Sequence, residues 1–273
     1  MIASRAPRYP WRTVFVLVAA GTLTTPLVFP YAMALRANGS GAGTADGMPP
    51  LSVALQFVLR TALFLAPAAF LGMWAARRIG LGAPHLEHAL DGGPEPARPS
   101  RTMLVPVLLW SIASSLLAFA IDAVFFHLLG VHDPAPEIHA RIDVAWWRSG
   151  LASFWAPFSE EIFDRLGLMS LLAWLLMRSL RPAREGRGRV LAFAAANLAT
   201  ALFFGWYHLS NEELFTSTLP SLVTLRTLLI VVPIGVVFGR LYQRLGLEAA
   251  ILAHFLVDVI VHVVRPIAER LFV

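Results

Sequence analysis

Two histidines and a pair of glutamates are the residues of this sequence whose types and spacing could do chemistry. Glu160 and Glu161 are adjacent, His208 follows later in the chain, and His254 stands four residues before Asp258. All of them lie in or beside hydrophobic stretches, where ionisable groups are costly and usually face the interior of a helix bundle or a wet cavity. A glutamate can act as the general base on a water molecule, and a histidine can assist it. The combination predicts attack of water on a carbonyl group.

The two adjacent glutamates differ in the partners that helical spacing gives them. Glu161 and Arg165 are four residues apart, so on a helix they share a face in the order that favours an ion pair. Glu160 is left without that partner, and Asp164 lies roughly on its face. A carboxylate without a cationic partner suits the role of a general base. Adjacent glutamates are also common at the start of a helix near the membrane interface, which is the structural alternative.

Each histidine has a neighbour one helical turn away. Phe204 precedes His208 by four residues, so its ring can pack against the imidazole. Asp258 follows His254 by four residues, and a carboxylate at that distance can fix the tautomer of an imidazole. Taken singly, His208 also fits an interfacial residue, and the pair of His254 and Asp258 fits a polar contact that joins two helices.

Several other chemistries are excluded or left open. The chain has no cysteine, which removes disulfides, thiolate catalysis and cysteine-bound metals. A serine mechanism is not favoured, because no Gly-x-Ser-x-Gly motif is present and Ser153 and Ser159 have no evident paired base. Glu160, His208 and His254 are the types that either bind a catalytic zinc ion or activate water without metal. The cofactor therefore stays undetermined between zinc and a metal-free mechanism.

The composition places these residues in a membrane. Of 273 residues, 57% are hydrophobic and 14% are charged, against about 25% charged in soluble domains, and the mean hydropathy is +0.66. The basic residues are all arginine and the net charge is +5. In so hydrophobic a chain, arginine clusters indicate cytoplasmic loops rather than a nucleic-acid partner. We therefore expect a multi-pass membrane protein in contact with lipid, in the plasma membrane if the source is bacterial.

Seven stretches are long enough to cross a bilayer, at about 20 residues each. The predicted fold is an all-α polytopic transmembrane bundle of about seven spans, with the aromatic-rich stretch 141–158 as an interfacial helix. We expect one integrated membrane domain, in which residues 1–135 form N-terminal spans with a polar loop near 77–101 and residues 141–265 form the helical core that carries the site. The predicted spans are 11–35, 51–75, 103–129, 158–177, 190–207, 219–241 and 245–264.

Arginine counts predict the orientation. With the N-terminus inside, the inner segments hold fourteen arginines and the outer segments hold five, so the N-terminus is predicted to be cytoplasmic. In this arrangement Glu160 and His208 lie at the outer ends of their spans, and His254 lies nearer the middle of the membrane.

The ordered motifs resemble the CPBP family of intramembrane proteases, which includes CAAX prenyl endopeptidases and bacteriocin-processing, Abi-like proteins. The resemblance covers about residues 156–264. One departure is Asp164, where that family usually has an apolar or aromatic residue. The residues that carry the resemblance are Glu160, Glu161 and Arg165, then Phe204 and His208, then His254 and Asp258.

The resemblance implies an endopeptidase that hydrolyses a peptide bond of a membrane-associated protein or peptide. Glu160 and His208 would activate the water, and His254 and Asp258 would bind that water or stabilise the oxyanion. Glu161 and Arg165 would hold the helices in place. Family members are described both as metalloproteases and as metal-free glutamate proteases, so a metal held by Glu160, His208 and His254 stays open.

Two other functions compete with a protease. A non-catalytic immunity or scaffold protein could keep the same motifs for packing alone. A proton-coupled transporter could use Asp122, Asp258 and Glu248 as relay acids, although the sequence shows no paired inverted halves. The protease is the leading interpretation.

Overall fold

All regular structure in the described part of the chain is helical, which confirms the predicted all-α class. The computed structural model describes residues 9–37, 50–96, 100–131, 144–180, 186–213 and 221–272. The predicted boundaries at residues 135 and 141 lie outside these ranges. The elements in chain order are α1 (Trp11–Leu23), η1 (Thr25–Val28), α2 (Phe29–Ala37), α3 (Pro50–Ile79), α4 (Pro84–Asp91), α5 (Ser100–Ala123), η2 (Val124–Leu128), α7 (Trp146–Glu160), η3 (Glu161–Met169), α8 (Ser170–Leu180), α9 (Arg187–Glu213), α10 (Ser221–Leu245), α11 (Leu247–Val259), η4 (Ile260–Val264) and α12 (Arg265–Phe272).

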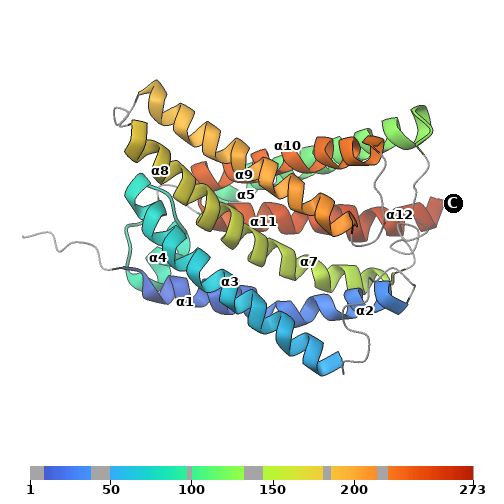
Figure 1. Cartoon of the computed structure of the whole chain (residues 1–273), viewed down its shortest axis with the longest axis horizontal. Coiled ribbons are helices and arrows are strands. Elements are labelled where there is room, and N and C mark those ends of the chain that lie inside the picture. Colours follow the sequence, from blue (N-terminus) through green and yellow to red (C-terminus); the bar gives the residue numbers. More distant parts are fainter. Residues whose placement is uncertain are drawn as a thin grey trace, which may run out of the picture.

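Long helices run side by side along the bundle (Figure 1), and six of them are long and apolar enough to cross a membrane. Their outward faces carry large apolar side chains such as Phe15, Leu63 and Leu128, which are at least 74% exposed. Such faces are suited to contact with lipid tails rather than water. The protein is therefore a multi-pass membrane protein. The six spans are Trp11–Ala34, Leu51–Ile79, Arg101–Leu128, Arg187–Leu209, Ser221–Leu245 and Leu247–Leu271.

The predicted fourth span, 158–177, is part of a longer rod. α7, η3 and α8 follow one another without a break and together run along the bundle (Figure 1). Four charged residues between 160 and 165 keep this rod outside the set of six apolar helices. The expected interfacial helix is not separate from the span, because residues 146–158 continue directly into it, and the start of that prediction at residues 141–143 lies outside the described part. Glu160 consequently sits in the interior of a long helical segment and not at the start of a helix.

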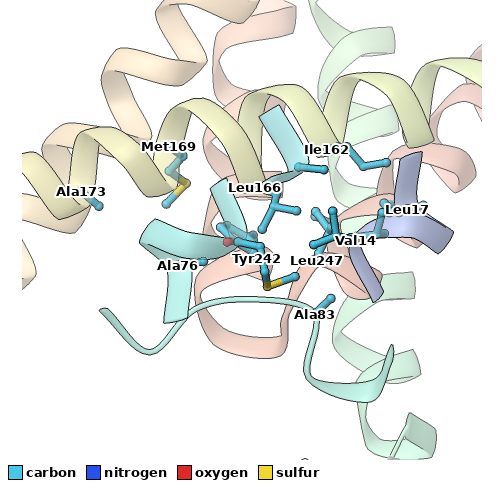
Figure 2. Packing of buried hydrophobic residues seen from close by; sticks show 14 of the residues in the cluster. Val14, Leu17, Ala76, Ala83, Ile162, Leu166, Met169, Ala173, Tyr242 and Leu247 are labelled. Atoms are coloured by element: carbon cyan, nitrogen blue, oxygen red, sulfur yellow. The ribbon is translucent and has the colours of Figure 1, made fainter. Parts of the chain in front are cut away.

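The rod is anchored in a buried apolar core. Ile162, Leu166 and Met169 of η3 face Val14 and other residues of α1, α3, α10 and α11 (Figure 2). Gly72 of α3 allows a close backbone approach, since a Cβ added there would lie 2.3 Å from the carbonyl oxygen of Leu166. This packing fixes the segment that begins with Glu161.

A one-residue turn places α11 against α10. Gly246 has a φ of +98°, a value that glycine adopts without steric cost, and the Leu247 N–H donates to the carbonyl of Gly82 at 3.0 Å. A second apolar cluster then joins α10, α11 and α5 through residues such as Phe238 and Val257. The turn brings His254 of α11 to the level of Phe238.

The polar stretch near 77–101, expected to be a loop, contains the short helix α4. Pro84 occupies its first turn and Gly92 ends it in the left-handed conformation, with a φ of +65°. These are the usual signals for the start and the end of a helix. The last residue of α4, Asp91, accepts the backbone N–H of Thr13 at 2.8 Å and its hydroxyl at 2.7 Å, so it caps the start of α1.

Candidate active site

The acidic pair lies where α7 passes into the π-helix η3. Glu160 is the last residue of α7 and Glu161 the first of η3, and π-helical turns are frequent at functional sites. Arg165 Nε lies 3.2 Å from Glu161 Oε2, and both side chains are fully buried. The pair expected from the four-residue spacing is therefore present, within the core.

His254 sits between the two glutamates. Its Nδ1 lies 2.9 Å from Glu161 Oε1, and because a carboxylate accepts, Nδ1 donates. Its Nε2 faces the other way, 3.8 Å from Glu160 Oε2 and 3.7 Å from Asp258 Oδ1. The ring of Phe238 stacks on the imidazole at 4.8 Å. The histidine is thus held in one orientation, with one nitrogen turned towards Glu160.

His208 joins the site through Phe204. Its Nδ1 lies 2.8 Å from the Phe204 carbonyl, which can only accept, so Nδ1 carries the proton. The centroids of the two rings are 4.4 Å apart, and the rings of Phe204 and His254 form a T-shaped pair with centroids 6.0 Å apart. The guanidinium of Arg165 lies over the Phe204 ring at 5.2 Å. Phe204 therefore touches both histidines and the buried arginine.

Tyr207 and Phe238 are site residues that the sequence analysis did not select. The Tyr207 hydroxyl donates to Asp164 Oδ2 at 3.4 Å. Asp164, the departure from the family pattern, is fully buried. Tyr207 could have been suspected from its place next to His208, whereas nothing in the apolar sequence around Phe238 marks it.

A cavity of about 700 Å³ opens beside these residues. His208, His254 and Asp258 line it together with Phe204 and Phe238, and its walls include apolar residues of α5, α10 and α11. A substrate chain in the cavity would meet both histidines. His208, His254 and Asp258 thus meet at the cavity, whereas Glu160 does not line it and reaches the group through His254 Nε2 at 3.8 Å.

The described part of the chain contains no preformed group of metal ligands. No group of three or more His, Asp or Glu side chains has the arrangement of a metal site within that part of the chain. His254 has one nitrogen on Glu161 and the other between Glu160 and Asp258. A metal held jointly by Glu160, His208 and His254 is therefore not supported by this geometry.

Two of the three acids named for a transporter, Asp122 and Glu248, have structural partners outside the group around His254. Asp122 is paired with Arg226 and Arg265 near the end of α5, and Glu248 accepts the N–H of Leu86 at 2.9 Å at the start of α11. These two positions are at opposite ends of the bundle (Figure 1). The contacts give each acid a local structural partner.

Comparison with known proteins supports the resemblance seen in the motifs. Residues 142–260 match the family model described as type II CAAX prenyl endopeptidase Rce1-like. No curated protein and no solved structure matches the chain. The matched segment contains the whole candidate site, from Glu160 to Asp258. Over this segment the chain is similar to the Rce1-like type II CAAX prenyl endopeptidases, which supports its resemblance to the CPBP family of intramembrane proteases.

Proposed function

We propose that the protein hydrolyses a peptide bond of a membrane-associated substrate by attack of a water molecule that Glu160 activates. The observation that carries the proposal is the position of His254 Nε2, which faces Glu160 and Asp258 while Glu161 holds Nδ1. Both separations from Nε2 exceed a direct hydrogen bond, and such separations suit a bridging water. The cavity beside His254 offers room for the substrate.

In the proposed reaction, Glu160 takes a proton from water as the water oxygen attacks the carbonyl carbon of the substrate. His208 has its proton on Nδ1, so its Nε2 accepts a hydrogen bond from the same water and orients it. The developing oxyanion faces His254 Nε2, which donates to it when it carries a proton. Glu160 then delivers its proton to the leaving nitrogen, the C–N bond breaks, and a carboxylic acid and an amine are formed.

Glu161 and Arg165 act through their neighbours in this proposal. Both are fully buried, so they do not meet the substrate. Glu161 sets which nitrogen of His254 carries the donated proton, and Arg165 balances its charge. Partners of this kind orient the groups that react.

The test uses purified protein in detergent and a farnesylated peptide with a Cys-aliphatic-aliphatic-Met ending, because the matched family is described as prenyl endopeptidases. Glu160→Gln should lower kcat by about 10²–10⁴-fold, the usual contribution of a general base. Glu87→Gln is the matched control, since Glu87 lies in α4 beside Arg77 and away from the site. Cleavage by Glu160→Gln at the parent rate would refute the assignment of the base and favour a non-catalytic role for the motif.

A further inference from the structure

Two tryptophans pack against each other near the ends of α3 and α8. These helices lie side by side and run in the same direction to one end of the bundle (Figure 1). Trp74 of α3 and Trp174 of α8 meet edge to face, with their ring centroids 4.7 Å apart. Both residues are only partly buried, so the pair keeps part of its surface turned outward from the bundle.

An arginine follows each tryptophan by four residues. The guanidinium of Arg78 lies over the Trp74 ring, 3.8 Å from its centroid, and donates to the Trp74 carbonyl at 2.8 Å. The guanidinium of Arg178 lies over the Trp174 ring at 5.9 Å. A cation over an indole ring is attracted by the negative face of the ring. Two neighbouring helices thus present the same Trp-x-x-x-Arg arrangement side by side.

The two guanidinium groups have donors to offer to an anion. Arg78 and Arg178 are exposed, and among the described residues neither is paired with a carboxylate. A guanidinium has five N–H donors, of which Arg78 uses one on its own helix. Arg189 of α9 differs from both, because it donates to the Ile79 carbonyl at 2.6 Å and so ties α9 to the end of α3.

The side chains along α3 and α8 change in the order of the parts of a phospholipid. Leu71 and Leu175 are 44% and 49% exposed and precede the arginines, so they lie deeper in the bilayer. Each tryptophan lies about 6 Å deeper than its arginine, at about 1.5 Å per residue. Tryptophan is enriched at the level of lipid headgroups, and the guanidinium fork matches a phosphate group. Apolar, aromatic and cationic side chains therefore follow the tail, the glycerol region and the phosphate of a lipid.

We infer that Arg78 and Arg178, with the Trp74–Trp174 pair beside them, bind the phosphate of an anionic phospholipid in the leaflet at this end of the bundle. The site is separate from the cavity beside His254, which none of these four residues lines. A lipid held by both arginines would bridge α3 and α8 and stabilise their contact. This lipid site goes beyond the proposed function, and its occupancy can be measured without any peptide.

The first experiment compares two lipids on the parent protein. Delipidated protein in detergent is mixed with dioleoyl-phosphatidylglycerol or dioleoyl-phosphatidylcholine, and native mass spectrometry gives a Kd for each. Phosphatidylglycerol should bind at least about tenfold more tightly, because two basic side chains near a membrane surface each favour anionic lipid. Equal Kd values for the two lipids would overturn the site.

Variants then locate the preference. Arg78→Gln and Arg178→Gln should each reduce the preference about threefold, and the double variant should bring it close to one, because each removes one of the two charges. Arg240→Gln is the matched control, since Arg240 is an exposed arginine near the end of α10 that pairs with Gln243 at 2.7 Å. This control should keep the parental preference. An equal loss in Arg240→Gln and Arg178→Gln would show a general effect of positive charge and contradict a specific site.

Thermal melting separates a lipid from a soluble phosphate compound. Phosphatidylglycerol should raise the melting temperature of the parent and of Arg240→Gln more than that of Arg78→Gln/Arg178→Gln, because a ligand that binds only the folded state stabilises it. Glycerophosphoglycerol has the same headgroup without acyl chains and should cause no shift at the same concentration. An equal shift with this compound would assign the arginines to a soluble phosphate and refute the lipid site.

Discussion

Glu161 Oε1 lies 2.9 Å from His254 Nδ1, although 93 residues separate them in the chain. The neighbouring Glu160 faces the other nitrogen of the same ring at 3.8 Å. Two consecutive acids thus face the two nitrogens of one imidazole ring. Glu161 is fully buried and also faces Arg165, so it links the orientation of the histidine to the ion pair in the core.

We predict that Glu161→Gln lowers kcat about 10- to 100-fold, as is usual for groups that orient a reacting histidine. The melting temperature in detergent should also fall, because Arg165 loses its buried counter-ion. In the double variant Glu161→Gln/Arg165→Met, the unpaired buried charge is gone, so the melting temperature should recover while kcat stays low. Parental kcat in the double variant would mean that Glu161 serves folding alone.

We predict that Tyr207→Phe lowers kcat by about tenfold or more with little change in melting temperature. The ring packs against Phe204 and His208, and phenylalanine keeps that packing. The hydroxyl that donates to Asp164 at 3.4 Å is lost, so the acidic cluster beside the site loses a hydrogen-bond donor. Tyr9→Phe is the control, since the Tyr9 hydroxyl bonds the Phe70 carbonyl away from the site. Equal activity of the two variants would exclude Tyr207 from the reaction.

Contacts within one helix of the site can be predicted from the sequence, because helical periodicity determines which residues share a face. Residues four apart share a face, and this rule gives both the contact of Glu161 with Arg165 and the packing of Phe204 on His208. Hydrophobicity and length likewise give the helical class and most of the spans.

Contacts between helices do not follow from spacing. Phe238 stacks on His254 only because the turn at Gly246 sets the register of two adjacent helices. Tyr207 meets Asp164 because two segments cross at that level. The first and last residues of the rod from α7 to α8 also could not be predicted from the sequence, because its buried charges interrupt the hydropathy pattern that marks a span.

We predict that the N-terminus is cytoplasmic. Arginines at the end of α3 and α8, at the start of α9 and at the end of α10 gather at one end of the bundle (Figure 1), and such an excess marks the inner side. The chain contains no cysteine, so single cysteines can be introduced at Arg187 and Leu271 without further changes. An impermeant maleimide added to intact cells should label Leu271→Cys and spare Arg187→Cys. The reverse labelling would invert the orientation.

The cap that Asp91 places on α1 predicts how stability depends on pH. Partial burial acts to raise the pKa of Asp91. This effect is outweighed by hydrogen bonds from the Thr13 hydroxyl and from the backbone N–H groups of Thr13 and Arg12, together with the charge of Arg12. The pKa of Asp91 is therefore held below its ordinary value. The folded state then binds this proton less readily than the unfolded state. The stabilisation is therefore present above about pH 4 and is lost as the pH falls through the unfolded and then the folded pKa.

Asp91→Asn should accordingly cost about 1 kcal/mol at pH 7, the usual value of a cap, and the cost should shrink towards pH 3. The measurement is the melting temperature of both proteins in detergent between pH 3 and pH 7. Glu95→Gln is the control, since Glu95 is an exposed acid shortly after α4. Many carboxylates titrate in this range, but only the difference between the parent and Asp91→Asn isolates this one. A difference that stayed constant over the whole range would show that the charge of Asp91 does not contribute to the cap.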